Sequence, residues 1–198
     1  LFDTGRVAEG ESFTVETLGG LVTAEVHENG QRIKVSMGKA EFKAKLIPVN
    51  ARNPEAEVIR TPIDIEGKTW EFCAVSVGNP HCVIPLASID AELAKKIGPQ
   101  VEHHPMFPNR INMQLLKVID RSNIQIEIWE RGAGYTLASG TSSCACAVIA
   151  RKLGLCDRDI TVHMPGGTLS IQVADDFSLI MTGPTTGVGV FELNPECL

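Results

Sequence analysis

Residues 139–153, with the sequence SGTSSCACAVIARKL, decide the fold of this chain of 198 residues. The stretch opens with Ser139, a residue type that caps helices, and Arg151 and Lys152 lie in its last turn, before Gly154. Such signals at both ends predict one helix over 139–153. The apolar residues 144–150 lie on nearly every side of this helix, and a helix without a polar face is buried. We therefore expect a hydrophobic helix at the centre of the molecule.

Short strands are predicted on both sides of this helix. An Asn29-Gly30 pair separates two alternating runs, 21–26 and 33–36, which is typical of a β-hairpin. A short helix is expected at 90–97, with Asp90 as its cap and Gly98-Pro99 as its end. Many antiparallel strands around one buried helix predict an α+β fold. Further strands are expected at 58–65, 69–77, 82–85, 110–119, 123–129, 160–163, 168–174, 179–182 and 188–193.

The composition excludes several classes of protein. Hydrophobic residues make up 43% and charged residues 21%, which is enough to build a packed core. The 18 basic and 24 acidic side chains give a net charge of -6 without a basic run, so nucleic acid is not an expected partner. No apolar stretch reaches the about 20 residues that cross a membrane, and residues 1–6 do not resemble a signal peptide. The six cysteines are expected to be free thiols in a cytoplasmic protein.

The segment 130–141, ERGAGYTLASGT, contains the first candidate site, because a strand end, a glycine loop and a helix start follow one another. The backbone N–H groups of Gly140 and Thr141 are free of helical partners and lie at the positive end of the helix dipole. They are therefore suited to bind a carboxylate. The hydroxyl of Ser139 either faces the bound group or serves only as a helix cap.

The second candidate site is the turn Gly78-Asn79-Pro80-His81-Cys82, which follows an apolar strand. His81 either exchanges hydrogen bonds with a substrate or is a structural histidine beside a turn. Asn112 opens a later strand, where its amide is available. The run Glu102-His103-His104 is expected to be a solvated loop and not a metal site. Phosphate-binding and dinucleotide-binding glycine motifs are absent from the sequence, which does not support phosphoryl or hydride transfer.

These motifs, in this order and spacing, resemble the diaminopimelate epimerase family, together with Asn112 and the turn Met164-Pro165-Gly166-Gly167. The resemblance implies two pseudo-symmetric halves, each an antiparallel sheet or barrel wrapped around a central hydrophobic helix. Helix 139–153 would then belong to the second half. We expect residues 41–185 to form that half, and residues 1–40 and 186–198 to be a remnant of the N-terminal half.

The resemblance also implies a reaction, the interconversion of LL- and meso-diaminopimelate in the synthesis of lysine and peptidoglycan precursors. Such an isomerase needs no cofactor, because two cysteines at helix N-termini remove and return the α-proton. Carried over residue by residue, the catalytic set is Ser139, His81 and Glu130. The residues implied to bind substrate are Asn79 and Asn112 at its distal end, Arg131 at its distal carboxylate, Glu130 through its backbone, and Gly140 and Thr141 at its α-carboxylate.

The sequence departs from the family pattern in two respects. Ser139 stands where the family has its second catalytic cysteine, and a hydroxyl is a much weaker acid than a thiol. The Cys-Gly-Asn-Gly run of the first half does not occur in this chain. We therefore expect an incomplete active site, whose partners are an amino acid substrate, the missing N-terminal half of the same protein and a second copy in a homodimer.

Two alternative functions remain open. Ser139 and Met113-Gln114 are also compatible with a related racemase for another amino acid, such as histidine or glutamate. The third hypothesis is a non-catalytic fragment or a binding protein that keeps the cleft without the chemistry.

Overall fold

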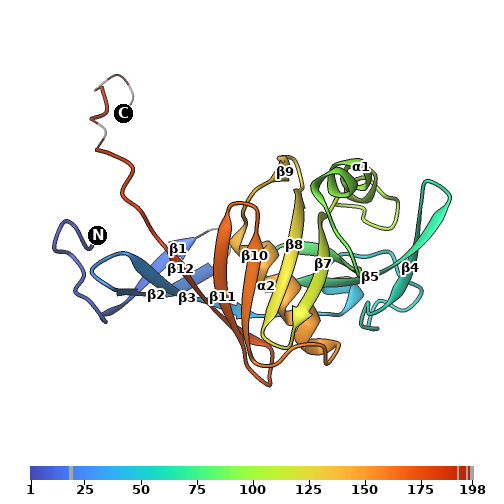
Figure 1. Ribbon diagram of the computed structural model, residues 1–198, viewed down its shortest axis with the longest axis horizontal. Coiled ribbons are helices and arrows are strands. Elements are labelled where there is room, and N and C mark those ends of the chain that lie inside the picture. Colours follow the sequence, from blue (N-terminus) through green and yellow to red (C-terminus); the bar gives the residue numbers. More distant parts are fainter. Residues whose placement is uncertain (18–19, 191, 195, 197–198) are drawn as a thin grey trace.

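The computed structural model of the chain describes residues 1–17, 20–190, 192–194 and 196. Twelve strands form one sheet, and two α-helices pack against it in the described residues (Figure 1). The order of the strands across the sheet is β1-β2-β3-β12-β11-β10-β8-β7-β6-β5-β4, and β9 pairs with β8. Their bounds are Ser12–Thr17 (β1), Gly20–His27 (β2), Arg32–Lys39 (β3), Thr61–Ile65 (β4), Lys68–Ser76 (β5), Pro80–Pro85 (β6), Asn112–Asp120 (β7), Asn123–Glu130 (β8), Gly134–Thr136 (β9), Asp159–Met164 (β10), Gly167–Val173 (β11) and Ser178–Pro184 (β12).

The helices α1 (Ala91–Glu102) and α2 (Gly140–Lys152) each connect two parallel strands. Helix α1 lies between β6 and β7, and α2 lies between β8 and β10. Parallel strands need a long crossover, which is usually a helix. The sheet is therefore antiparallel as expected, except at the pairs β6–β7 and β8–β10. At these two pairs the expectation was wrong, because each helix returns the chain to the end of the sheet from which the first strand of the pair started.

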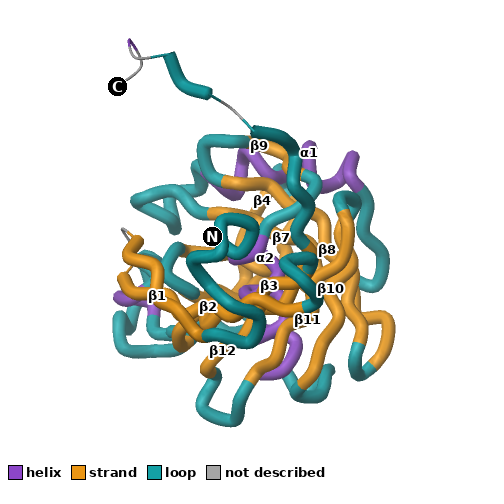
Figure 2. Tube along the Cα trace, turned by 90° about the vertical axis from the view of Figure 1, so that its left-hand side faces the viewer, coloured by secondary structure: helices purple, strands orange, loops and turns teal. Residues whose placement is uncertain are grey.

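Helix α2 is the central hydrophobic helix that the sequence predicts. Residues 142–150 are all buried, and the helix contacts strands β5 to β8 and β10 to β12. Figure 2 shows it in purple, enclosed by the orange strands. Ser139 and Leu153 are its caps, which confirms the predicted range 139–153.

Two hydrophobic cores lie on opposite faces of the strands β5, β6 and β7. Cys73 and Val75 of β5 pack in the core that contains α2, whereas Phe72 and Ala74 pack in the core that contains α1. Successive side chains of a strand point to opposite faces, so a strand buried on both faces is apolar throughout. This arrangement explains the uninterrupted apolar run of β5.

The hairpin at Asn29-Gly30 is confirmed, since β2 and β3 pair around it and both residues have positive φ angles, 53° and 83°. The strand expected from residue 58 begins at Thr61. The strand expected at 188–193 is wrong for its described residues, because Val188 and Val190 are 91% and 101% exposed and have no neighbouring strand; residue 191 lies outside the described chain. The short strand β9 was not expected.

Helix α1 is longer than the sequence suggests. Asp90 caps it as predicted, with its Oδ1 accepting a hydrogen bond of 2.7 Å from Leu93 N. However, the helix continues through Gly98-Pro99 to Glu102. Val101 and Glu102 are buried, so tertiary packing of the last turn outweighs the loss of one backbone hydrogen bond at Pro99.

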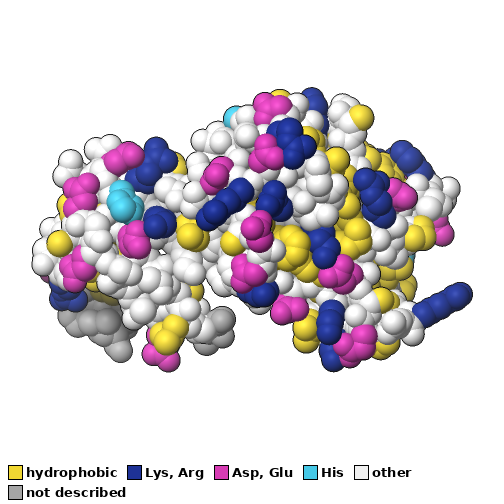
Figure 3. Space-filling view, turned by 90° about the horizontal axis from the view of Figure 1, so that it is seen from below, with side chains coloured by type: hydrophobic (Ala, Val, Ile, Leu, Met, Phe, Trp, Pro, Cys, Tyr) yellow, Lys and Arg dark blue, Asp and Glu magenta, His cyan; other side chains and the backbone are white. Residues whose placement is uncertain are grey.

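The strands β1, β2 and β3 form an arm that extends from one side of the molecule (Figure 1). Strand β3 pairs with β12, so the sheet continues across the domain boundary expected near residue 40. The division into 41–185 and a remnant stays a prediction. Figure 3 shows that the molecule narrows between the arm and the larger body. No helix in the described part of the chain is long and apolar enough to cross a membrane.

Candidate functional site

The start of helix α2 presents unpaired backbone donors. Ser139 is extended (φ -157°, ψ 126°), and its carbonyl accepts the first helical hydrogen bond, from Ser143 N, at 3.1 Å. Gly140 and Thr141 precede that donor, so their N–H groups have no partner within the helix. The Ser139 Oγ accepts a hydrogen bond of 3.4 Å from Ser142 N. The cap predicted for Ser139 is therefore present, and the two donors predicted to bind a carboxylate lie beside it.

A cleft of about 450 Å³ lies at this helix start, between the arm and the body. Thr141, Gly78 and Asn79 line the side of the cleft that belongs to the body. The arm and the residue that follows β5 complete the lining with Thr17, Leu21, Val22, Ser36, Met37, Gly38, Lys39 and Val77. The two glycine-containing motifs, which are about sixty residues apart in the sequence, therefore meet at one cavity.

A chain of hydrogen bonds connects the turn before β6 with the first turn of α2. The Asn79 Nδ2 lies 3.5 Å from Thr141 Oγ1, and Asn79 Oδ1 lies 2.9 Å from His81 Nε2. The other ring nitrogen of His81 lies 3.2 Å from Gln114 Oε1. Gln114 Nε2 in turn donates to Ser142 Oγ at 3.0 Å. Asn79 and His81 are thus fixed to the helix start from two sides.

His81 is neutral at physiological pH. Its pKa is lowered to about 4, chiefly by burial and to a smaller extent by the charge of Arg131, while the hydrogen bond to Gln114 opposes the shift. A neutral imidazole has one N–H, so it donates to only one of the two amide oxygens that face its ring, Asn79 Oδ1 or Gln114 Oε1. Because His81 is fully buried, Asn79 lies between it and the cleft.

Asn112 connects the Pro80 turn with the strand end at Arg131. Its Nδ2 donates to Pro80 O at 2.9 Å, and its Oδ1 accepts from Arg131 N at 2.9 Å. Asn112 is buried, with both amide atoms engaged, whereas Arg131 is exposed and its Nη1 donates to Asn109 O at 2.9 Å. The Glu130 carbonyl accepts from Ala133 N at 3.1 Å and closes the turn. The substrate contacts implied for Asn112, Glu130 and Arg131 stay predictions.

The turn at residues 164–167 packs against the segment that leads into α2. Gly166 N donates to Leu137 O at 2.8 Å, and a Cβ atom at Gly166 would lie 2.9 Å from that carbonyl oxygen. Met164 Sδ accepts a hydrogen bond of 3.2 Å from Ser143 Oγ. A glycine is therefore needed at position 166, because only a residue without a side chain permits this approach.

Two residues of this region were not identified as site residues from the sequence. Gln114 follows Asn112 by two positions on β7, and side chains at that spacing share a face of a strand, which is the signal that identifies it. Glu102 was expected in a solvated loop, and this is wrong. It is the last residue of α1 and is buried among contacts with Trp129, Gly132 and Arg110.

The cysteines in the described part of the chain do not supply a thiolate to the site. Cys73, Cys82, Cys144, Cys146 and Cys156 are free and buried, which confirms the prediction of free thiols for the described residues; Cys197 lies outside them. Burial raises the pKa of Cys144 to about 12. In the described chain, no group of three His, Cys, Asp or Glu side chains is placed to hold a metal ion.

Comparison with known proteins places the chain in a family. The family model described as diaminopimelate epimerase matches residues 73–188. Diaminopimelate epimerase 2 of a Nostoc species is 50% identical over 196 residues, which cover 99% of this chain and 68% of that protein. Diaminopimelate epimerase of Moorella thermoacetica is 38% identical over 192 residues, which cover 95% of this chain and 68% of that protein.

Solved structures share the fold at low sequence identity. A probable proline racemase from Agrobacterium radiobacter superposes with a TM-score of 0.69 and 14% identity, covering 98% of this chain and 65% of that one. A hydroxyproline epimerase from Agrobacterium vitis superposes with a TM-score of 0.65 and 13% identity. The match covers 93% of this chain and 60% of that one. The chain spans about two thirds of the length of the curated relatives. With the predicted fold confirmed and both motifs at one cleft, the chain belongs to the diaminopimelate epimerase family of isomerases.

Proposed function

We propose that this chain carries the α-carboxylate site and the distal-end site of an enzyme that interconverts LL- and meso-diaminopimelate. The reaction breaks the C–H bond at one α-carbon and forms a new C–H bond on its opposite face, without a change in oxidation state. The complete enzyme works in the cytoplasm. The free thiols of the described residues support this location, because disulfides are rare in that compartment.

The observation that carries this proposal is the position of the helix start at the cleft. The N–H groups of Gly140 and Thr141 are unpaired within α2, and Thr141 lines the cavity of about 450 Å³. These donors hold an α-carboxylate and stabilise the negative charge that builds up on it when the α-proton leaves. The same donors therefore serve both binding and catalysis.

The distal end of the substrate is assigned to Asn79 and Arg131. Asn79 lines the cleft, and Arg131 is exposed on the turn that Asn112 fixes beside Pro80. A guanidinium binds a carboxylate through two parallel hydrogen bonds, which suits a substrate that carries a second carboxylate. This pairing favours diaminopimelate over a monocarboxylic amino acid.

Proton transfer on the face of the α-carbon that lies toward the start of α2 is assigned to Ser139. His81 and Glu130 are proposed to help orient it. The Ser139 hydroxyl is a weak acid and lies 3.5 Å from Thr141 Oγ1, so it relays a proton and does not act as the base. The base is proposed to come from the part of the longer relatives that this chain does not span, because the described thiols are buried.

The test is α-proton exchange in deuterated water with the complete gene product and a panel of amino acids. We expect deuterium at the α-carbons of LL- and meso-diaminopimelate only. Exchange with histidine or glutamate instead would establish a related racemase, and tight binding without any exchange would establish a binding protein. Arg131→Lys should lower the affinity for diaminopimelate, whereas Arg158→Lys, at an exposed arginine that ends a surface loop, should not.

A further inference from the structure

Glu102 is a buried carboxylate outside the residues assigned to the reaction. Its side chain is 4% exposed, on the face of α1 that also buries Ala94, Ile97 and Val101. An ionised carboxylate in such a place is costly unless hydrogen bonds and positive charges compensate it. The contacts of Glu102 therefore indicate what keeps it in this position.

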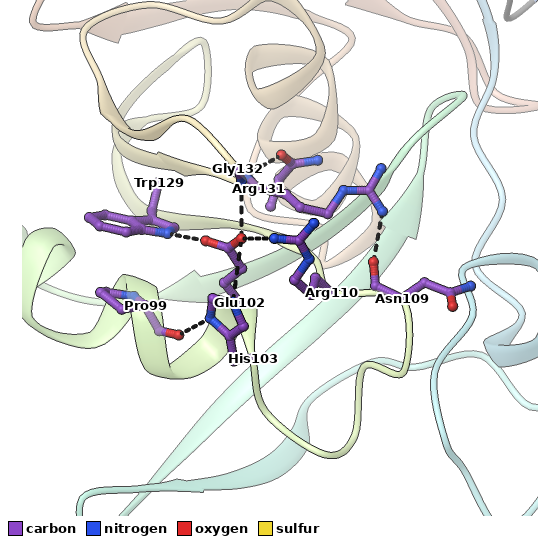
Figure 4. Close-up of polar contacts among 9 residues, drawn as sticks. Pro99, Glu102, His103, Asn109, Arg110, Trp129, Arg131 and Gly132 are labelled. Atoms are coloured by element: carbon purple, nitrogen blue, oxygen red, sulfur yellow. Dashed lines mark hydrogen bonds and ion pairs between the residues drawn. The ribbon is translucent and has the colours of Figure 1, made fainter.

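Three donors from three parts of the chain converge on this carboxylate (Figure 4). Trp129 Nε1 of β8 donates to Oε2 at 2.8 Å, and Gly132 N donates to Oε1 at 3.0 Å. Arg110 Nη1 lies 3.3 Å from Oε1. Burial favours the neutral acid, but these hydrogen bonds and the charges of His103 and Arg110 outweigh it, so the pKa of Glu102 lies below its ordinary value.

The hydrogen bond to Gly132 fixes the turn that presents Arg131. Two successive backbone N–H groups in this turn are held by side chains, Arg131 N by Asn112 and Gly132 N by Glu102. Gly132 has a φ angle of 80°, which is the left-handed region that favours glycine. Figure 4 shows the Arg131 guanidinium extending away from Glu102 toward Asn109. Glu102 thus contacts the backbone of this turn, whereas the guanidinium of Arg131 contacts Asn109.

We propose that Glu102 is a positioning residue for the distal carboxylate of the substrate. Its hydrogen bond to Gly132 N fixes the turn after strand β8 and so sets the direction in which the Arg131 side chain points. This inference rests on the proposed function, in which Arg131 binds that carboxylate. The effect belongs to substrate binding and not to proton transfer, since Ser139 and Gly140 are held by other contacts. Glu102 should therefore change KM much more than kcat.

The test is steady-state epimerisation of diaminopimelate by the complete gene product and its Glu102→Gln variant. Gly132 N and Trp129 Nε1 donate to different oxygens of Glu102, so an amide, with one oxygen and no charge, weakens the hydrogen bond to Gly132 whichever of the two donors its oxygen faces. We expect KM to rise about tenfold, with kcat within about twofold of the parent enzyme. The matched control is Glu92→Gln, an exposed carboxylate on the same helix, which should leave both parameters unchanged.

A second pair of variants separates positioning from simple anchoring of α1. Trp129→Phe removes the indole donor but leaves the Gly132 hydrogen bond, so KM should stay near the parent value. If Glu102→Gln does not fold, Glu102→Asp replaces it, because the shorter carboxylate keeps its charge but no longer reaches Gly132. The same rise in KM is expected.

The outcomes distinguish the two proposals. A parent enzyme that does not epimerise diaminopimelate refutes the proposed function. An active parent with a Glu102→Gln variant of unchanged KM and reduced apparent kcat shows that Glu102 only holds α1 in place, because misfolded molecules lower the active fraction without altering KM. That result overturns the positioning role alone.

Discussion

Ser139 caps α2, and the family resemblance implies a catalytic cysteine at the same position. Its Oγ accepts a hydrogen bond from Ser142 N, and the helix start beside it favours negative charge. A thiol at this position would share that environment. Thiolates form readily at helix N-termini, whereas a serine alkoxide does not.

The Ser139→Cys variant of the complete gene product should therefore exchange the α-proton of diaminopimelate faster, by about a hundredfold. Its new thiol should also react with iodoacetamide at neutral pH faster than the thiol of Ser122→Cys, a surface control. Mass spectrometry of the labelled peptides measures this. Equal reactivity of the two thiols would show that the helix start does not activate this position.

His81 gives the protein a defined dependence of stability on pH. Its pKa is about 4 in the folded chain and about 6.5 when exposed, so the unfolded chain binds a proton first as the pH falls. The stability that the neutral ring contributes is present above pH 6.5 and is lost between pH 6.5 and 4. Over this range the loss amounts to about 3 kcal/mol.

Denaturant unfolding at pH 7 and pH 4 should show this loss in the parent and not in His81→Gln. His103→Gln, at an exposed site, should retain the pH dependence of the parent. The difference between the two variants isolates His81 from the carboxylates that titrate in the same range. If the free energy of unfolding depended on pH equally in both variants, the assignment of this loss to His81 would be wrong.

At the scale of elements, the position of helix α1 depends on its packing against strand β8. A Cβ atom at Gly98 would lie 2.5 Å from Cδ2 of Trp129, so the glycine allows the helix to approach β8 closely. This contact places the Trp129 indole next to Glu102. Gly98 therefore serves packing and does not end the helix.

Gly98→Ala should destabilise the protein by about 1–3 kcal/mol, although alanine favours helices more than glycine does. The overpacked Trp129 ring must shift, which also weakens its hydrogen bond to Glu102. Lys96→Ala, on the same helix, should change the free energy of unfolding by less than about 0.5 kcal/mol. Thermal or denaturant unfolding measures both, and a Gly98→Ala variant as stable as the parent would exclude the close packing.

At the scale of the whole molecule, the two cores enclose the five described cysteines completely enough to protect them from reagents in solution. The five described cysteines are buried on the two faces of the strands β5 to β8. In native buffer these thiols should resist iodoacetamide for as long as the protein stays folded, and all should react in guanidinium. Peptide mapping separates them from Cys197. Rapid labelling of Cys144 or Cys146 in the native protein would contradict a central position of α2.

The sequence by itself determined the features that depend on neighbouring residues. The ends of α2, the hairpin at Asn29-Gly30 and the cap at Asp90 are local, because capping and turn geometry act within a few residues. The burial of α2 was also predictable, since its apolar residues surround it. The two glycine-containing motifs could be assigned to one active site through the family resemblance, although neither motif alone indicates the other.

Only the tertiary structure decided the length of α1 and the partners of Glu102 and Gln114. The last turn of α1 continues past Pro99 because Trp129 and Gly132, about thirty residues away, hydrogen-bond to its final side chain. Gln114 reaches His81 and Ser142 through strand pairing and through the packing of α2 on the sheet. Contacts of this kind depend on how distant segments meet, and no local pattern of residues encodes that meeting.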